Sequence, residues 1–122
     1  TMMNFTKVSS NRVNVEFSGK IDRDQMTKVL DELFAAIADM EHGLLMYRIG
    51  KLEMPTLGAI AVELKNLPKI FRLVQKIDRI AVVCDQGWIQ TSTEIEGKLI
   101  PGLEMKAFDL DKESAAIEWL EA

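Results

Sequence analysis

Side chains suited to catalysis are scarce in this sequence and do not cluster. The 122 residues include a single cysteine, Cys84, and a single histidine, His42. A lone cysteine cannot form an intramolecular disulfide, and a structural zinc site needs four ligands, mostly Cys or His. Neither of the glycine-rich phosphate-binding patterns, GxGxxG and GxxxxGK[ST], occurs. The sequence therefore predicts no metal site, no cofactor and a protein that acts by binding and not by catalysis.

Cys84 and His42 each have a structural and a functional interpretation. His42 falls at the predicted C-terminal end of the first helix, before Gly43, where the helix dipole favours a histidine. Cys84 ends an apolar run that reads as a strand. A buried thiol at that place is usually inert, but ligand sites of α/β proteins form at the carboxyl ends of strands. A contact with a ligand, or an enzyme that uses Cys84, therefore stays open as a minor alternative.

Trp88, Thr56 and Leu57 complete the predicted ligand-binding set with Cys84. Trp88 follows the turn Asp85–Gly87 and opens a helix. It shares a helix face with Ile95 and Leu99, so it either packs in the core or lines an apolar pocket. Thr56 is a suitable N-cap for the second helix, which Leu57 begins.

A stripe of basic residues crosses the second helical region. Lys65, Lys69, Arg72 and Lys76 are spaced by four, three and four residues, and Leu73 lies beside them. The net charge of the whole chain is −4, which argues against nucleic acid as a partner. A charge run of this kind is usually a solvated helix face. The alternative is a surface that meets anionic lipid head groups or an acidic protein partner, with Leu73 inserted shallowly.

The elements that must position these residues alternate between strand and helix. Strands are predicted around residues 13–17, 44–49, 79–84 and 104–110, with residues 4–9 as an extra edge strand. Four helical regions are predicted: from the cap Asp22 to Ile37, from Thr56 to Val74, over residues 87–100, and after the cap Asp111. The second region should break at Pro68 and restart with Asn66 as its cap. This order predicts one α/β domain, residues 1–122, with a mixed and mostly parallel sheet.

Apolar periodicity predicts which faces are buried. The stripe of the first helix should face the sheet, and so should one face of the second helix, while residues 80–83 form a central strand covered on both sides. The stripes are Met26, Val29, Leu30, Leu33, Phe34 and Ile37 in the first helix, and Leu57, Ile60, Ala61, Leu64, Leu67, Phe71 and Val74 in the second. The last helix should bury Ile117 and Leu120 with Trp119 beside them.

The sequence also predicts where the protein works. No stretch approaches the roughly 20 apolar residues that a membrane span needs, and residues 1–5 lack the pattern of a signal peptide. We expect a cytoplasmic protein, with peripheral attachment at the inner membrane face if the basic stripe meets lipid.

The overall pattern resembles the SpoIIAA-like family, small bacterial proteins related to STAS domains. The resemblance lies in the run 80–83 followed by Asp85 and Trp88, and in the ending 108–110 with 115–120. It covers about residues 10–121 and implies a STAS-type fold with helices chiefly on one side of the sheet. STAS anti-anti-sigma proteins are switched by phosphorylation in a motif like Asp-Ser-Ser-Gly-Leu-Gly, which matches residues 53–58 here. Pro55 holds the acceptor position and Thr56 comes one residue late, so we expect no phosphorylation-controlled release of a partner.

Two functions follow from these observations. The first is a non-enzymatic binding domain for a small apolar or lipid-like ligand, since this family also resembles the CRAL-TRIO lipid-binding fold. The alternative is a protein-interaction module of the anti-sigma-factor-antagonist kind. The sequence leaves the oligomeric state open, with a homodimer among the alternatives.

Overall fold

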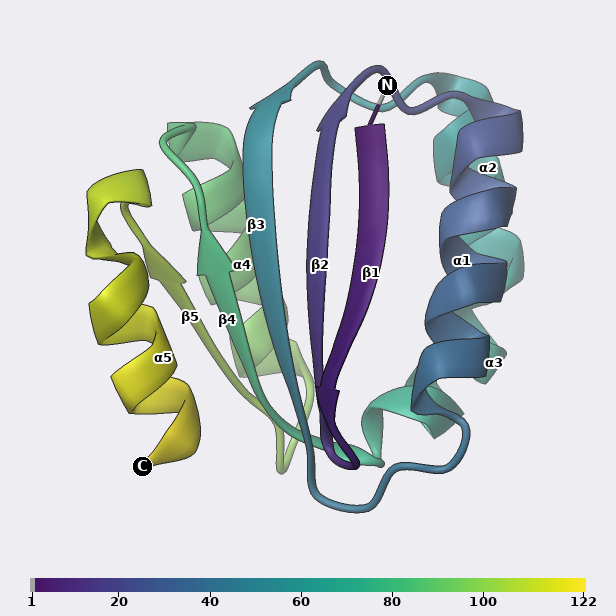
Figure 1. Cartoon of the computed structure of the whole chain (residues 1–122). Helices are drawn as coiled ribbons and strands as arrows, with labels where there is room; N and C mark the ends of the chain where they lie inside the picture. The colour runs from purple at the N-terminus through teal and green to yellow at the C-terminus, as the bar shows by residue number, and fades with distance from the viewer. Residues whose placement is uncertain (1) are drawn as a thin grey trace.

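The computed structural model describes residues 2–122 as one five-stranded sheet with helices on both faces (Figure 1). The sheet order β1-β2-β3-β4-β5 follows the order of the strands in the chain. Strands β1 and β2 pair antiparallel, and all other neighbours pair parallel. The strands are β1 (Met2–Ser9), β2 (Arg12–Gly19), β3 (Gly43–Leu52), β4 (Ile77–Val83) and β5 (Glu104–Phe108). The predicted mixed, mostly parallel sheet and its extra edge strand are confirmed.

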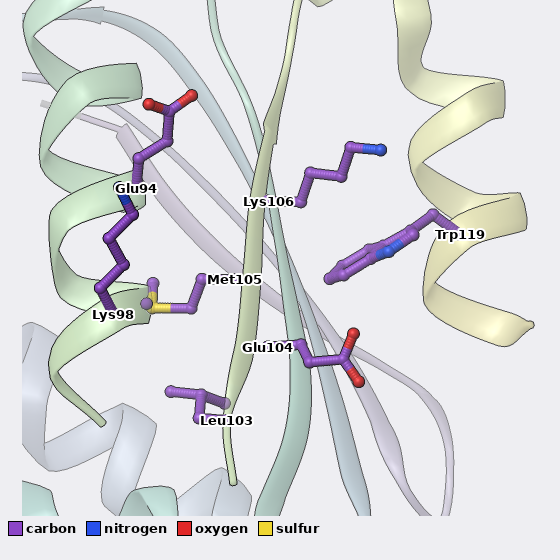
Figure 2. Close-up of a pocket in the computed structure, with 8 residues that line it drawn as sticks. Glu94, Lys98, Leu103, Glu104, Met105, Lys106 and Trp119 are labelled. Atoms are coloured by element: carbon purple, nitrogen blue, oxygen red, sulfur yellow. The ribbon is translucent and has the colours of Figure 1, made fainter. Parts of the chain in front are cut away.

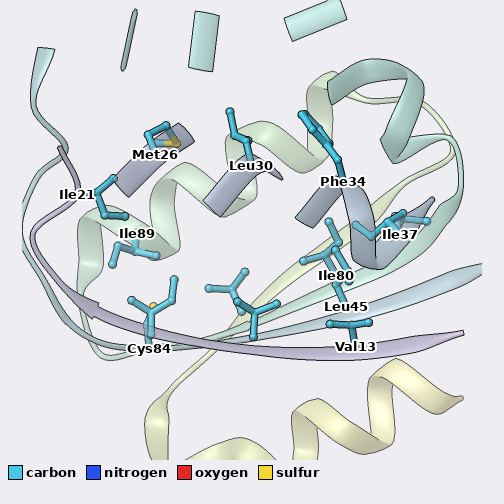
Figure 3. Close-up of a cluster of buried hydrophobic side chains, with 14 of the residues drawn as sticks. Val13, Ile21, Met26, Leu30, Phe34, Ile37, Leu45, Ile80, Cys84 and Ile89 are labelled. Atoms are coloured by element: carbon cyan, nitrogen blue, oxygen red, sulfur yellow. The ribbon is translucent and has the colours of Figure 1, made fainter. Parts of the chain in front are cut away.

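Helices lie chiefly on one side of the sheet, as predicted. The helices α1 to α4 cover one face, and α5 covers the other (Figures 1 and 3). The helices are α1 (Arg23–Ile37), α2 (Leu57–Lys65), α3 (Leu67–Val74), α4 (Gly87–Leu99) and α5 (Glu113–Glu121), with a 3-10 turn at Leu110–Lys112. None of the helices within residues 2–122 is long and apolar enough to cross a membrane.

The central strand β4 separates two hydrophobic cores. Ile80 and Val82 belong to the larger core under α1 to α4. Figure 3 shows Ile80 in this core together with the apolar stripe of α1. Ala81 and Val83 point the other way, into a smaller core that Ala116 and Leu120 of α5 complete. Because alternate residues of a strand face opposite sides, a strand covered on both sides must be apolar throughout. The prediction for residues 80–83 and the burial of Leu120 are therefore confirmed.

The predicted helix caps at Asp22 and Thr56 are confirmed. The Asp22 side chain accepts a hydrogen bond from the Gln25 N–H at 2.9 Å. The Thr56 hydroxyl accepts one from the Ala59 N–H at 3.2 Å. Each bond satisfies an N–H that has no partner within its helix.

Two predicted helix ends are wrong, and a third is right in position but not in its hydrogen bond. The helix α1 ends at Ile37, and His42 instead adopts a left-handed backbone with φ 53° just before β3. Asp111 lies within the 3-10 turn and does not cap α5. The helix does break at Asn66, ahead of Pro68, but the Asn66 amide donates back to the Val62 carbonyl at 2.8 Å and makes no cap hydrogen bond. A short polar side chain such as that of Asn66 can bond to several nearby backbone groups, and periodicity does not distinguish these alternatives.

Candidate functional site

The carboxyl ends of β3 and β4, where ligands bind in many α/β proteins, are closed by the protein's own glutamines. Gln86 forms two hydrogen bonds of 2.8 Å with the backbone of Leu52, one to its N–H and one to its carbonyl. Gln90 donates 3.0 Å bonds to the Cys84 carbonyl and to the Asp109 carboxylate. These contacts join the end of β3 to the start of α4, so structural hydrogen bonds occupy the carboxyl ends of the strands.

Cys84 is buried at this edge and is chemically quiet. Its side chain is fully covered, and its thiol donates a weak hydrogen bond to the Gln86 carbonyl at 3.9 Å. Burial raises the pKa of the Cys84 thiol, so the nucleophilic thiolate is disfavoured at neutral pH. His42 precedes β3 at the opposite end of the sheet and pairs with Asp78 at 3.0 Å. His42 is therefore too far from Cys84 to act as its base.

The other three predicted ligand residues have separate places on the surface. Thr56 uses its hydroxyl as the α2 cap, and the neighbouring Leu57 is 85% exposed. Trp88 opens α4 with 38% of its surface exposed. Two surface hollows, of about 540 and 370 Å³, are lined by other residues.

The most distinctive surface of the protein is apolar and lies on α2 and α3. Large apolar side chains stand out here instead of packing on the sheet. We call this set the α2–α3 apolar surface; it consists of Met54, Leu57, Ile60, Leu64 and Phe71, which are 68%, 85%, 39%, 60% and 48% exposed. The helix α4 adds exposed Ile95 and Leu99, at 55% and 72%.

The sequence predicted the opposite orientation for α2. Periodicity placed Leu57, Ile60 and Leu64 against the sheet, but fully buried Ala59 and half-buried Val62 face the core instead. The helix α2 is apolar on both faces, so periodicity alone did not decide which face is covered. Ala59 is small and fully buried in the larger core, and α2 packs chiefly against α1. Ile95 and Leu99, which were predicted to share a helix face with Trp88, are exposed as well.

The basic stripe is divided between exposed and structural roles. The Lys69 amine lies 4.4 Å from the centre of the Phe34 ring, and the Lys76 amine donates to the Ala38 carbonyl at 2.6 Å, just beyond α1. Lys65 and Arg72 are exposed near the ends of α2 and α3. No ion pair recorded among residues 2–122 neutralises these four cations.

Leu73 belongs to the core side of α3. It is half-buried and packs against the larger hydrophobic core. Phe71, two residues earlier, is the large apolar side chain that α3 presents to solvent. If a membrane meets this helix, Phe71 is therefore better placed than Leu73 to enter it.

A glutamate on α4 has a raised pKa, partly because of a carboxylate on α2. Burial, and then the Glu63 carboxylate of α2, raise the pKa of Glu96 on α4. Burial, and then the Glu96 carboxylate, raise the pKa of Tyr47 on β3. These side chains were not singled out in the sequence, because like charges on separate helices show no spacing pattern.

Comparisons with known proteins agree with this architecture. A family model described as SpoIIAA-like matches residues 12–121. A protein of the DUF3478 family with a SpoIIAA-like fold from Shewanella loihica PV-4 superimposes with a TM-score of 0.73 at 19% identity, over 98% of this chain and 92% of that one. Phosphorylated SpoIIAA, a Bacillus cell fate determinant, gives a TM-score of 0.56 at 13% identity, over 97% of this chain and 99% of that one. No curated protein matches the sequence.

The structural likenesses concern the fold, whereas the family match rests on the sequence and spans nearly the whole chain. The resemblance seen in the sequence is thereby confirmed. This chain belongs to the SpoIIAA-like family.

Proposed function

We propose that this chain is a non-enzymatic binding module and that the α2–α3 apolar surface is its contact surface. The observation that carries the proposal is the exposure of Leu57, Leu64 and Phe71 at 85%, 60% and 48%. Apolar area in water is unfavourable by about 25 cal/mol per Å², so a partner that covers these side chains gains affinity. Leu57, Ile60 and Leu64 are spaced by three and four residues and therefore share one face of α2. Adjacent exposed apolar side chains of this kind mark interaction sites in soluble proteins.

A protein partner fits this surface best. The SpoIIAA-like family and fold favour a protein-interaction module of the anti-sigma-factor-antagonist kind. Pro55 stands at the expected acceptor position, and the Thr56 hydroxyl is already engaged with the Ala59 N–H. Docking in this proposal is therefore independent of phosphorylation at the start of α2.

An anionic membrane or a lipid-like ligand is the second candidate, supported by the cations on the same helices. Lys65, Lys69 and Arg72 accompany the α2–α3 apolar surface, and no recorded ion pair involves them within residues 2–122. Each cation near an anionic membrane contributes about 1 kcal/mol. Three such contributions with a shallow apolar contact give weak and reversible attachment.

Photo-crosslinking in the cells of origin tests the proposal and separates the two candidates. The chain carries a photoreactive phenylalanine analogue at Phe71 or, as a control, at exposed Glu118 on α5. We expect adducts at position 71 and none at position 118. A protein-sized mass increase identifies a protein partner, and an increase of several hundred daltons identifies a lipid. The same yield at both positions, or none at position 71, would contradict the proposal.

Vesicle co-sedimentation tests the membrane candidate alone. Wild-type protein should sediment with anionic vesicles at low salt, and less so as salt screens the attraction. Changing Lys69 and Arg72 to Glu should abolish sedimentation, whereas changing Lys106 and Lys112, which lie outside α2 and α3, to Glu should not. Wild-type protein that stays in the supernatant at low salt would rule the membrane out and leave the protein partner.

A further inference from the structure

The sheet ends at β5 with backbone groups that have no strand to bind. Strand β5 pairs with β4 from Glu104 to Phe108, and the Phe108 carbonyl accepts from the Cys84 N–H at 3.0 Å. Backbone groups of successive residues point to opposite sides of a strand. Since Phe108 faces β4, Met105 and Ala107 direct their N–H and C=O groups outward. Within residues 2–122 the sheet has no further strand on that side.

A hollow of about 540 Å³ runs along this edge. Figure 2 shows that it lies between α4 and α5, with β5 as its floor. Met105 and Leu103 turn toward the α4 side, and Lys106 and Glu104 turn toward the α5 side, where Trp119 also points at the strand (Figure 2). The edge therefore combines outward-facing backbone groups with two different sides. On the α4 side Met105 and Leu103 lie beside Glu94 and Lys98, and on the α5 side Glu104 and Lys106 lie beside Trp119.

The charged side chains of β5 determine which residues an added strand should carry opposite them. Glu104 is 64% exposed and lies 3.7 Å from Arg79, while Lys106 is also exposed and lies 5.2 Å from the centre of the Phe108 ring. A strand added antiparallel would form hydrogen-bonded pairs at Met105 and Ala107. Glu104 and Lys106 would then occupy the non-hydrogen-bonded sites, where cross-strand side chains come closest. An added strand with an acidic residue opposite Lys106 and a basic residue opposite Glu104 complements both charges.

We propose that the β5 edge binds an extended peptide segment of a partner protein as a sixth, antiparallel strand. The segment carries an acidic, then an apolar, then a basic residue, so that the apolar one faces Met105. Backbone bonds to Met105 and Ala107 supply affinity, and the two charge pairs set the register and direction of the segment. This site is separate from the α2–α3 apolar surface and does not depend on it.

A lone segment fits this edge better than the β5 edge of a second copy. The helix α4 packs directly on β5, since a Cβ built at Gly97 would lie only 3.1 Å from the Met105 Cβ. Joining two β5 strands would place them 4.7–4.9 Å apart, whereas two packed helices need 8–10 Å between their axes. The two α4 helices would therefore collide, while a single strand brings no helix with it.

A labelled peptide with the sequence of residues 102–108 is a direct probe, because an antiparallel copy of this sequence places Glu opposite Lys106 and Lys opposite Glu104. Fluorescence anisotropy compares it with a peptide in which Glu and Lys are exchanged. We expect the exchanged peptide to bind wild-type protein at least about fivefold more weakly, since two favourable cross-strand pairs become unfavourable. The double variant Glu104→Lys/Lys106→Glu should reverse that preference.

Ala107→Pro tests the backbone bonds. Proline removes an N–H that faces outward and leaves the bonds to β4 in place. We expect peptide binding to be lost, with an unchanged circular dichroism spectrum, while Ala107→Ser and Leu64→Ser bind as wild type does. If Ala107→Pro fails to fold, amide exchange in the wild type gives the same information. The Met105 and Ala107 amides should become protected when the peptide is added, and those of β1, the other edge strand, should not.

Several results would overturn the proposal. These are equal affinity for the two peptides, no binding of either at millimolar concentration, or no reversal by the double variant. Protection of the Met105 and Ala107 amides that rises with protein concentration in the absence of peptide would also overturn it, because a second copy would then cover the edge.

Discussion

Replacing Val82 with aspartate tests the central position of β4 most severely. Val82 is 3% exposed and belongs to the larger core under α1 to α4. An aspartate there loses the apolar burial of valine and introduces a carboxyl group that has no partner. The two losses differ in their dependence on pH, which allows them to be measured separately.

The expected loss is comparable to the whole stability of a domain. Burial of a valine side chain contributes about 2 kcal/mol. A buried carboxyl group stays protonated, with its pKa raised by several units, and each unit corresponds to about 1.4 kcal/mol. In the folded variant the carboxyl pKa lies above its unfolded value of about 3.9, so the native state holds the extra proton. The stability of the variant therefore falls as pH rises from about 4, by up to about 4 kcal/mol at pH 7.

Urea unfolding followed by circular dichroism at pH 4 and pH 7 measures both losses. The control is Val82→Asn, which has nearly the same shape as aspartate but no titrating group. Relative to wild type at each pH, the Asp variant should lose much more stability at pH 7 than at pH 4, and the Asn variant should lose the same at both. An unchanged midpoint for Val82→Asp, or equal losses for the two variants at both pH values, would refute the interior position of Val82.

Other positions give smaller and distinct effects. Gly43→Ala should lower the free energy of unfolding by about 1–3 kcal/mol, because its Cβ would lie 3.1 Å from the Lys76 backbone carbonyl oxygen and 2.9 Å from Ile77 Cδ1; a urea midpoint equal to wild type would contradict this close contact. Glu96→Gln should stabilise the protein increasingly as pH rises above the ordinary carboxyl range, because the raised pKa means that ionised Glu96 destabilises the folded state. Glu63→Gln should lower the Glu96 pKa, as measured in an NMR titration. Thr56→Ala should cost about 1 kcal/mol in thermal unfolding through loss of the helix cap, with Thr56→Ser close to wild type. Intact mass of protein isolated from its own cells should show no stoichiometric phosphate on Thr56.

Patterns that depend on local spacing predicted much of the fold. The stripe of α1 holds buried Met26, Leu30, Phe34 and Ile37, because a helix covered on one face needs this spacing. The continuous apolar run of β4 predicted a strand with both faces covered. Asp22 and Thr56 predicted helix starts, because their side chains can accept hydrogen bonds from N–H groups three residues later.

Features that depend on tertiary contacts were not predictable. The helix α2 has two apolar faces, and only the close fit of Ala59 against the core shows which one is buried. The hydrogen bonds of Gln86 to Leu52 join residues 34 positions apart. The β5 edge becomes visible only when the strand order is known, since the sequence does not state which strand lies last. The candidate contact surfaces were therefore found in the structure.

Cysteine labelling inside intact cells tests most directly whether the α2–α3 apolar surface is covered by a partner. The only native thiol, Cys84, is fully buried and should not react, so a thiol introduced at Leu64 reports on that surface alone. The control thiol is placed at exposed Glu118 on α5. We expect a maleimide to label the Leu64→Cys variant markedly more slowly in cells than in purified protein, and the Glu118→Cys variant at similar rates in both. If the thiol at position 64 is labelled as fast in cells as in purified protein, nothing covers this surface, and the proposed binding function is wrong.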